Sequence, residues 1–86
     1  MAPSGPSEAL AALLGKTRAQ LLVAASCGAT TTELGKSAGI SPASASYHAT
    51  ILRNAGLISS RRVGVAVLHQ LTELGRELIG RQPAVV

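Results

Sequence analysis

The sequence predicts a small, mainly helical domain in which two closely spaced helices are followed by a two-stranded β-hairpin and a last helix. Two helix-start signals lie close together, TTTE at 30–33 and Ser-Pro at 41–42. After Gly56 the helical pattern gives way to two runs rich in β-branched residues, which flank Val63-Gly64 and are typical of a hairpin. A length of 86 residues leaves room for one core only.

The first part of the chain is predicted to contain a tail and two helices. MAPSGPS, residues 1–7, is typical of a flexible tail because it is rich in proline, glycine and serine. Ser7 is expected to cap a short helix whose apolar side carries leucines at helical spacing, Leu10, Leu13 and Leu14. The second helix is expected over 16–26, with Cys27 buried in its last turn and polar residues exposed at Lys16, Arg18 and Gln20.

Two capped helices are expected next, in the layout of a helix-turn-helix. In TTTE, Thr30 stands three residues before a glutamate, which is a capping box, so we expect a short helix over 31–38. The dipeptide Ser41-Pro42 supplies an N-cap and a proline for the first helical position of a longer helix over 42–55. The hairpin and a last helix capped by Thr72 and closed by Pro83 complete the order.

The helix over 42–55 is predicted to place small apolar residues on one side and an aromatic ring on the other. Ala45, Ala49 and Leu52 lie within one narrow arc, which we expect to face the core. Tyr47 is the only aromatic side chain of a chain without Phe or Trp, and it lies nearly opposite this arc. Its position indicates contact with a ligand, although a ring covering the edge of a thin core remains the alternative.

Residues 14–79 resemble the DNA-binding domain of ArsR-like winged-helix transcriptional regulators. The resemblance rests on Glu33-Leu34, Gly39-Ile40-Ser41, Ser46-Tyr47-His48, Leu52-Arg53, Ala55-Gly56-Leu57-Ile58, Arg61-Arg62, Leu71-Thr72 and Gly75. It implies a winged helix-turn-helix with about five helices and a two-stranded wing, in a bacterial regulator that forms a homodimer through its first and last helices. The chain departs from the family at positions that usually carry larger or basic side chains, or tyrosine: Ala38, Ala45, Ala49, Val65 and His69.

The predicted partner is double-stranded DNA with an inverted-repeat operator. Short polar side chains can reach base edges in the major groove, so base contacts are assigned to Ser44, Ser46, Tyr47, His48 and Thr50. Phosphate contacts are assigned to flanking residues, Thr31, Thr32, Lys36, Ser41, Arg53, Arg61 and Arg62. A net charge of +4 favours an anionic partner. Packing remains an equally good interpretation for His48 and the better one for His69, and Arg61-Arg62 could also be a solvated strand end.

The domain is expected to span 8–81, followed by a C-terminal tail over 82–86. We expect no enzyme, since there is no nucleophile with a base, no paired carboxylates and no phosphate loop. No cofactor or metal is expected either, because Cys27, His48 and His69 lack ligand spacing. A single cysteine and the lack of a long apolar run favour a cytoplasmic protein. The alternative function is a winged-helix protein-interaction module without specific DNA binding, which the apolar wing tip favours.

Overall fold

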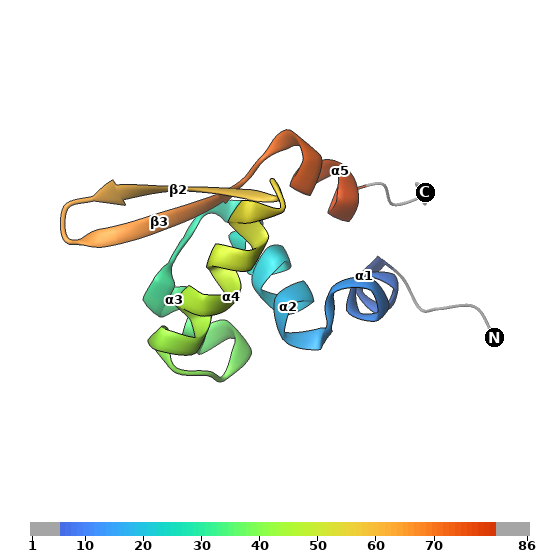
Figure 1. Cartoon of the computed structure of the whole chain (residues 1–86), viewed down its shortest axis with the longest axis horizontal. Helices are drawn as coiled ribbons and strands as arrows, with labels where there is room; N and C mark the ends of the chain where they lie inside the picture. The colour runs from blue at the N-terminus through green and yellow to red at the C-terminus, as the bar shows by residue number, and fades with distance from the viewer. Residues whose placement is uncertain (1–5, 81–86) are drawn as a thin grey trace.

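The computed structural model describes residues 6–80, and this part of the chain contains five α-helices, a short 3₁₀ turn and a three-stranded antiparallel sheet (Figure 1). In chain order the elements are α1 (Pro6–Leu14), α2 (Lys16–Ala24), the 3₁₀ turn (Ala25–Cys27), β1 (Ala29–Thr30), α3 (Thr31–Ala38), α4 (Pro42–Asn54), β2 (Ile58–Val63), β3 (Ala66–Leu71) and α5 (Glu73–Gly80). Within the described residues, no helix has the length and apolar character needed to cross a membrane.

The fold class predicted from the sequence is confirmed. The β2–β3 hairpin, which we call the wing, projects from one end of the molecule, while α1 and α5 lie at the other end (Figure 1). The helix-turn-helix, α3 and α4, lies between them beneath the hairpin. The sequence did not indicate β1, which pairs with β3 and makes the strand order β1-β3-β2. Strand β3 is therefore central, and His69 lies between Ala29 on one side and Ser60 on the other.

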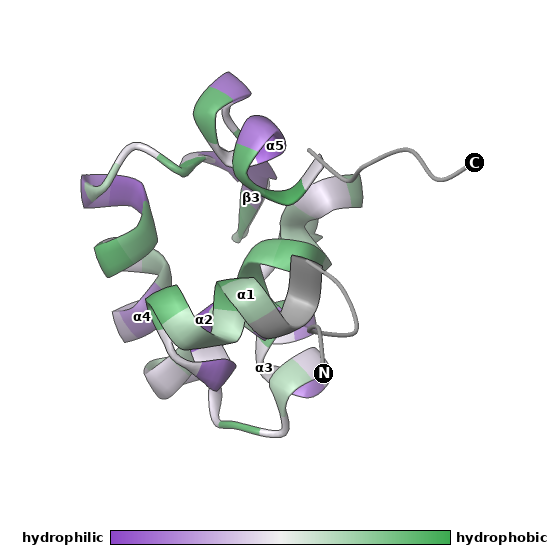
Figure 2. Cartoon of the chain, turned by 90° about the vertical axis from the view of Figure 1, so that its right-hand side faces the viewer, coloured by the Kyte–Doolittle hydropathy of each residue, from purple (hydrophilic) through white to green (hydrophobic). Residues whose placement is uncertain are grey.

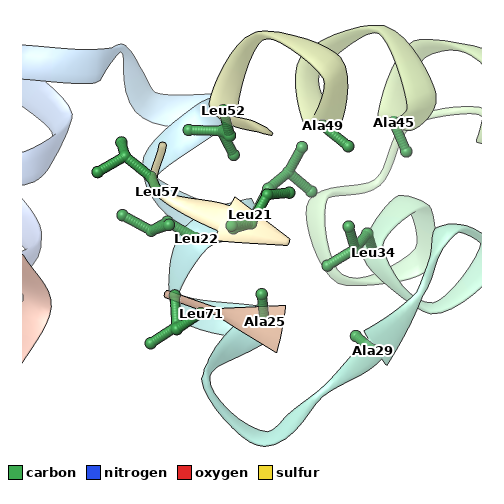
Figure 3. Close-up of a cluster of buried hydrophobic side chains, with 11 residues drawn as sticks. Leu21, Leu22, Ala25, Ala29, Leu34, Ala45, Ala49, Leu52, Leu57 and Leu71 are labelled. Atoms are coloured by element: carbon green, nitrogen blue, oxygen red, sulfur yellow. The ribbon is translucent and has the colours of Figure 1, made fainter. Parts of the chain in front are cut away.

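The core is built from leucines and alanines together with Ile58, and Figure 3 labels most of these side chains. Its largest fully buried side chains are Leu21, Leu22, Leu34 and Leu52. Ala45 and Ala49 are buried with Leu52 on one side of α4, as the helical wheel predicted. Because alanine has only a methyl group, α4 can approach the buried side of α2 and α3 closely. Close helix packing thus compensates in part for the absence of large aromatic side chains.

Helix α1 differs from the prediction in two ways. Helix α1 begins at Pro6, so Ser7 lies inside its first turn and does not precede it as an N-cap; proline is favoured at this first helical position. Leu10 is buried, but Leu13 is 68% exposed. Leu13 lies about 100° around the helix from Leu14 and falls outside the side that packs on the core.

Cys27 is exposed, which corrects the expectation that it would be buried. Helix α2 ends at Ala24, and the 3₁₀ turn that follows changes the angular spacing of the side chains. Ala25 faces the core as a result, whereas Ser26 and Cys27 face solvent. The predicted tail over 1–7 is wrong at residues 6–7, which belong to α1. Its first five residues lie outside the described residues, as do the predicted tail over 82–86 and the closing Pro83.

Thr72 joins the end of the wing to α5, as the sequence predicted for a cap. Its hydroxyl accepts a hydrogen bond from the amide of Gly75 at 3.1 Å and donates one to the carbonyl of Gly56 at 2.6 Å. A side chain at Gly75 would collide with the carbonyl of Leu57, so the missing Cβ lets α5 pack directly on the backbone before β2. These contacts fix α5 and the base of the wing against each other.

Candidate nucleic-acid interface

The turn between α3 and α4 is fixed by hydrogen bonds that the sequence largely predicted. Thr30 and Glu33 form both bonds of the capping box: the Glu33 amide donates to Thr30 Oγ1 at 3.2 Å and the Thr30 amide donates to Glu33 Oε1 at 2.9 Å. Gly39 ends α3 in the left-handed conformation, with φ of 68°. Ser41 then caps α4 by accepting from the Ser44 amide at 3.1 Å.

A glycine inside α3 holds the two helices at close range. The Ile40 amide donates to the Gly35 carbonyl at 2.9 Å, and a Cβ on Gly35 would lie only 2.8 Å from the Ile40 carbonyl oxygen. Only glycine fits there without moving the turn. Backbone contacts therefore set the direction of α4 relative to α3, and with it the orientation of the outer face of α4.

The outer face of α4 carries the predicted base-contacting residues, and we call it the polar face: Ser44, Ser46, Tyr47, His48 and Thr50. Ser44 and Ser46 are exposed, and Tyr47 is 63% exposed, so the ring does not serve the core. Thr50 is half-buried, and its hydroxyl donates to the Ser46 carbonyl at 3.0 Å. The Thr50 hydroxyl can therefore accept a hydrogen bond from a ligand but has no proton left to donate.

Within the polar face, His48 is half-buried and contacts α2. Its Nδ1 atom lies 3.2 Å from Nη1 of Arg18, a residue of α2 that the sequence analysis had placed in solvent. Arg18 is half-buried, and its guanidinium also donates from Nε to the Leu14 carbonyl at 3.0 Å. The ring of His48 meets that of Tyr47 edge to face, with centroids 5.3 Å apart and planes inclined by 66°.

Most of the predicted phosphate-contacting residues are exposed around α4. These are Thr32, Lys36, Ser41, Arg53, Arg61 and Arg62. The two wing arginines follow each other along β2, so their side chains leave opposite faces of the hairpin. Arg62 shares a face with Ser60, which pairs with the buried His69, and Arg61 lies on the outer face. The structure thus separates the two arginines that the sequence analysis had grouped together.

Thr31 differs from the other predicted phosphate contacts because its hydroxyl already has a partner. Thr31 Oγ1 lies 2.8 Å from Nε2 of His69, and Ser60 Oγ lies 2.8 Å from Nδ1 of the same ring. His69 is only 3% exposed. Burial lowers the pKa of His69 below its ordinary value of 6.5, and the positive charge of Arg53 lowers it further. His69 is therefore a neutral ring that ties the first turn of α3 to the wing.

Two polar contacts between elements escaped the sequence analysis. His69 was interpreted as a packing residue, and its hydrogen bonds to Thr31 and Ser60 were not foreseen. Arg18 was interpreted as solvent-exposed, and its contact with His48 joins residues 30 positions apart. Hydrophobic periodicity detects neither contact, because it describes which side of a helix is apolar and not which polar side chains meet. Among residues 6–80, no group of three metal-ligating side chains could hold an ion.

No protein-family model and no curated protein matches the sequence. Similar solved structures do exist. TubR of type III plasmid segregation has a TM-score of 0.68 at 20% identity, with 92% of this chain and 85% of that chain covered. Reduced HlyU from Vibrio cholerae has a TM-score of 0.65 at 24% identity, with 85% and 86% covered. The apo C30AH42A mutant of Lactococcus lactis ZitR has a TM-score of 0.61 at 30% identity, and the match covers 78% of this chain but 54% of ZitR.

These similarities establish the winged-helix fold. The chain has this fold. The match to TubR spans most of both chains, so the likeness covers the complete winged-helix domain, including the wing and the flanking helices. The helix-turn-helix of α3 and α4, the β2–β3 wing and the terminal helices α1 and α5 thus form a known arrangement, in which the polar face of α4 is an outer surface.

Proposed function

We propose that this protein is a sequence-specific regulator of transcription that binds double-stranded DNA and belongs to the ArsR-like group. The polar face of α4 carries the proposal: its one aromatic ring, Tyr47, is 63% exposed although the core contains no aromatic side chain at all. Helix α4 buries alanines and exposes the one large ring of the chain, so the apolar surface of this ring is available to contact a ligand. The similar solved structures share the winged-helix fold, which is compatible with this function.

The chemistry of the polar face fits the major groove. Hydroxyl groups on Ser44 and Ser46 can donate to or accept from base edges, and the Tyr47 ring can lie against a thymine methyl group. The polar face itself has no charged residue, so base reading and phosphate binding are divided between different elements. Exposed cations flank it on α3, at the end of α4 and on the wing: Lys36, Arg53, Arg61 and Arg62.

A homodimer on an inverted-repeat operator completes the proposal. Figure 2 looks onto the end of the molecule opposite the wing, where α1 and α5 lie and α1 is coloured largely hydrophobic. Leu13 on α1 and Leu74 on α5 are 68% and 56% exposed. A second copy packed on these helices would cover both leucines and present two α4 helices to successive major grooves. As a bacterial DNA-binding regulator, the protein would act in the cytoplasm.

The decisive experiment is selection of duplexes from a random pool by the wild-type protein, followed by fluorescence anisotropy with the selected duplex. We expect tight binding that resists random competitor DNA and weakens steeply between about 50 and 200 mM salt. Tyr47→Ala should lower the specific affinity about tenfold, whereas Arg76→Ala, which removes a charge from α5, should leave sequence preference unchanged. An unaltered preference in Tyr47→Ala would remove α4 from recognition.

A protein-interaction module is the second candidate because the wing tip is apolar. Val63 is 50% exposed and Val65 is 99% exposed, where a basic side chain would have favoured DNA. If the selection yields no preferred duplex and random competitor abolishes all binding, this second function replaces the first.

A further inference from the structure

His48 is held by a partner that can only donate hydrogen bonds. Arg18 Nη1 lies 3.2 Å from His48 Nδ1, and the same guanidinium is anchored by its Nε atom to the Leu14 carbonyl at 3.0 Å. A guanidinium has five N–H donors, no acceptor, and no accessible deprotonated form. In this contact Nδ1 must therefore supply a lone pair. The direction of this hydrogen bond is therefore fixed: Arg18 donates and His48 accepts.

The contact also fixes where the proton of the neutral ring resides. A neutral imidazole carries one proton, on either Nδ1 or Nε2. Since Nδ1 accepts from Arg18, the proton lies on Nε2, and this atom becomes a hydrogen-bond donor. Among the residues that the structure describes, Nε2 of His48 has no hydrogen-bond partner. No fully buried polar side-chain atom among these residues lacks a partner, so Nε2 is not fully buried. The Nε2–H group is thus unpartnered among these residues and not fully buried.

The ring is oriented from two sides. Arg18 holds Nδ1 from α2, and the edge-to-face contact with Tyr47, 5.3 Å between centroids, restrains the ring from within α4. Edge-to-face pairs of aromatic rings are favourable arrangements. His48 therefore presents its donor with a defined direction beside the exposed ring of Tyr47.

We propose that Arg18 is a positioning residue that makes His48 a hydrogen-bond donor toward DNA, so that His48 selects an acceptor atom on a base edge. The inference rests on the proposed DNA-binding function. Acceptors in the major groove are N7 of the purines, O6 of guanine and O4 of thymine, whereas cytosine presents only its amino group. His48 consequently favours a purine or thymine on the strand it faces and disfavours cytosine. Arg18 sets this preference without touching a base.

The first test measures the tautomer and does not involve DNA. Nitrogen chemical shifts of the His48 ring, measured by NMR well above the ordinary histidine pKa of about 6.5, distinguish a proton on Nε2 from a proton on Nδ1. We expect the Nε2–H form in the wild type, a mixture of the two forms in Arg18→Met, and recovery of the Nε2–H form in Arg18→Lys, whose ammonium also only donates. Lys16→Met removes a neighbouring charge from α2 and should leave the tautomer as in the wild type.

The second test measures base discrimination with the duplex selected on the wild-type protein. Each base pair of the selected duplex is replaced in turn, and binding is measured by anisotropy. We expect one position at which cytosine is rejected by about fivefold in the wild type and at which His48→Ala loses this rejection. Arg18→Met should lose it too, and the double variant should lose no more than His48→Ala alone, because Arg18 acts through His48.

The two tests separate failure of the inference from failure of the proposed function. A wild-type ring with its proton on Nδ1, or a tautomer unaffected by Arg18→Met, overturns the role of Arg18 even if the protein binds its operator tightly. Retained discrimination in Arg18→Met overturns it as well. If the tautomer behaves as expected but no duplex is selected, the DNA-binding function is wrong and the reading role of His48 is lost with it. If Arg18→Met does not fold, Arg18→Gln takes its place in both tests, because a glutamine side chain can accept a hydrogen bond as well as donate one and so no longer fixes the tautomer.

Discussion

The helix-turn-helix and the wing are attached to the core in different ways. Both helices of the helix-turn-helix begin with a side-chain cap, and α3 packs on the turn through Gly35. The wing is buried only at its base, and Val65 at its tip is 99% exposed. A rigid α4 presents fixed hydrogen-bonding groups, as base reading requires. A wing held at one end can adjust to a partner, which suits contacts with phosphates or with another protein.

His69 connects the helix-turn-helix and the wing through hydrogen bonds. Its ring is hydrogen-bonded to Thr31 at the start of α3 and to Ser60 on β2, each at 2.8 Å. Neutral imidazole has one donor and one acceptor nitrogen, and each hydroxyl can serve either of them. The wing base is thus coupled to α3 by a buried polar contact in addition to apolar packing.

The largest effect is expected from Leu34→Ala in the helix-turn-helix. Leu34 is 1% exposed, and its removal leaves a cavity between α3 and the core. We expect a loss of about 2–5 kcal/mol, a large share of the roughly 5–15 kcal/mol that stabilises a domain. Chemical denaturation measures this loss. Val23→Ala, which truncates an apolar side chain of α2 that is 42% exposed, is the control and should cost far less; equal losses would contradict the assignment of the core.

A smaller loss is expected when the helix-turn-helix is forced apart by one methyl group. In Gly35→Ala the new Cβ would lie 2.8 Å from the Ile40 carbonyl oxygen, which belongs to the backbone and cannot rotate away. We expect destabilisation by about 1–3 kcal/mol, measured by thermal or chemical denaturation, together with weaker DNA binding because α4 changes direction.

Gly80→Ala provides the control for this substitution. Gly80 is also helical, but a Cβ there meets no atom within 4 Å. Alanine is the better helix former, so the control should be neutral or slightly stabilising. A destabilised Gly80→Ala together with a stable Gly35→Ala would show that backbone propensity, and not contact with the turn, decides the outcome.

The sequence predicted those parts of the fold that depend on neighbours along the chain. The capping box at Thr30, the Ser41 cap and the buried alanines of α4 each follow from residues within one or two helical turns. The fold class followed from their order. The polar face of α4 was predicted by the same reasoning, because the exposed position of Tyr47 is the complement of its buried side.

What the sequence could not predict are contacts between polar side chains of different elements. Arg18 and His48 are separated by 30 positions, and Thr31 and His69 by 38. Strand β1 is only two residues long and exists through pairing with β3. Its two residues, Ala29 and Thr30, carry no strand pattern by themselves. Each of these features needs the tertiary arrangement, since the local sequence is compatible with solvent exposure in every case.

The burial of His69 predicts that the stability of the protein depends on pH. Its pKa is lowered in the folded protein by burial and by Arg53, so the unfolded chain binds the proton more readily. The stability that the neutral His69 ring contributes is fully present above the ordinary pKa of about 6.5. It is lost as the pH falls through the lowered pKa of His69 in the folded protein. Denaturation midpoints measured at several pH values should show this loss, and His69→Gln, which keeps a donor and an acceptor, should lack that component. An identical pH profile in both proteins would contradict the prediction.

The smallest effect is expected at the wing tip. Val65 is 99% exposed, so Val65→Ser removes no packing and should change the free energy of unfolding by less than about 0.5 kcal/mol. It should also leave affinity for the selected duplex unchanged, because the DNA contacts proposed for the wing come from Arg61 and Arg62 and not from the tip. Arg62→Ala, by contrast, should weaken binding to all sequences alike and reduce the salt dependence. If Val65→Ser is instead markedly destabilised or loses a protein partner while DNA binding persists, the tip packs against another chain, and the wing serves docking where α4 serves DNA.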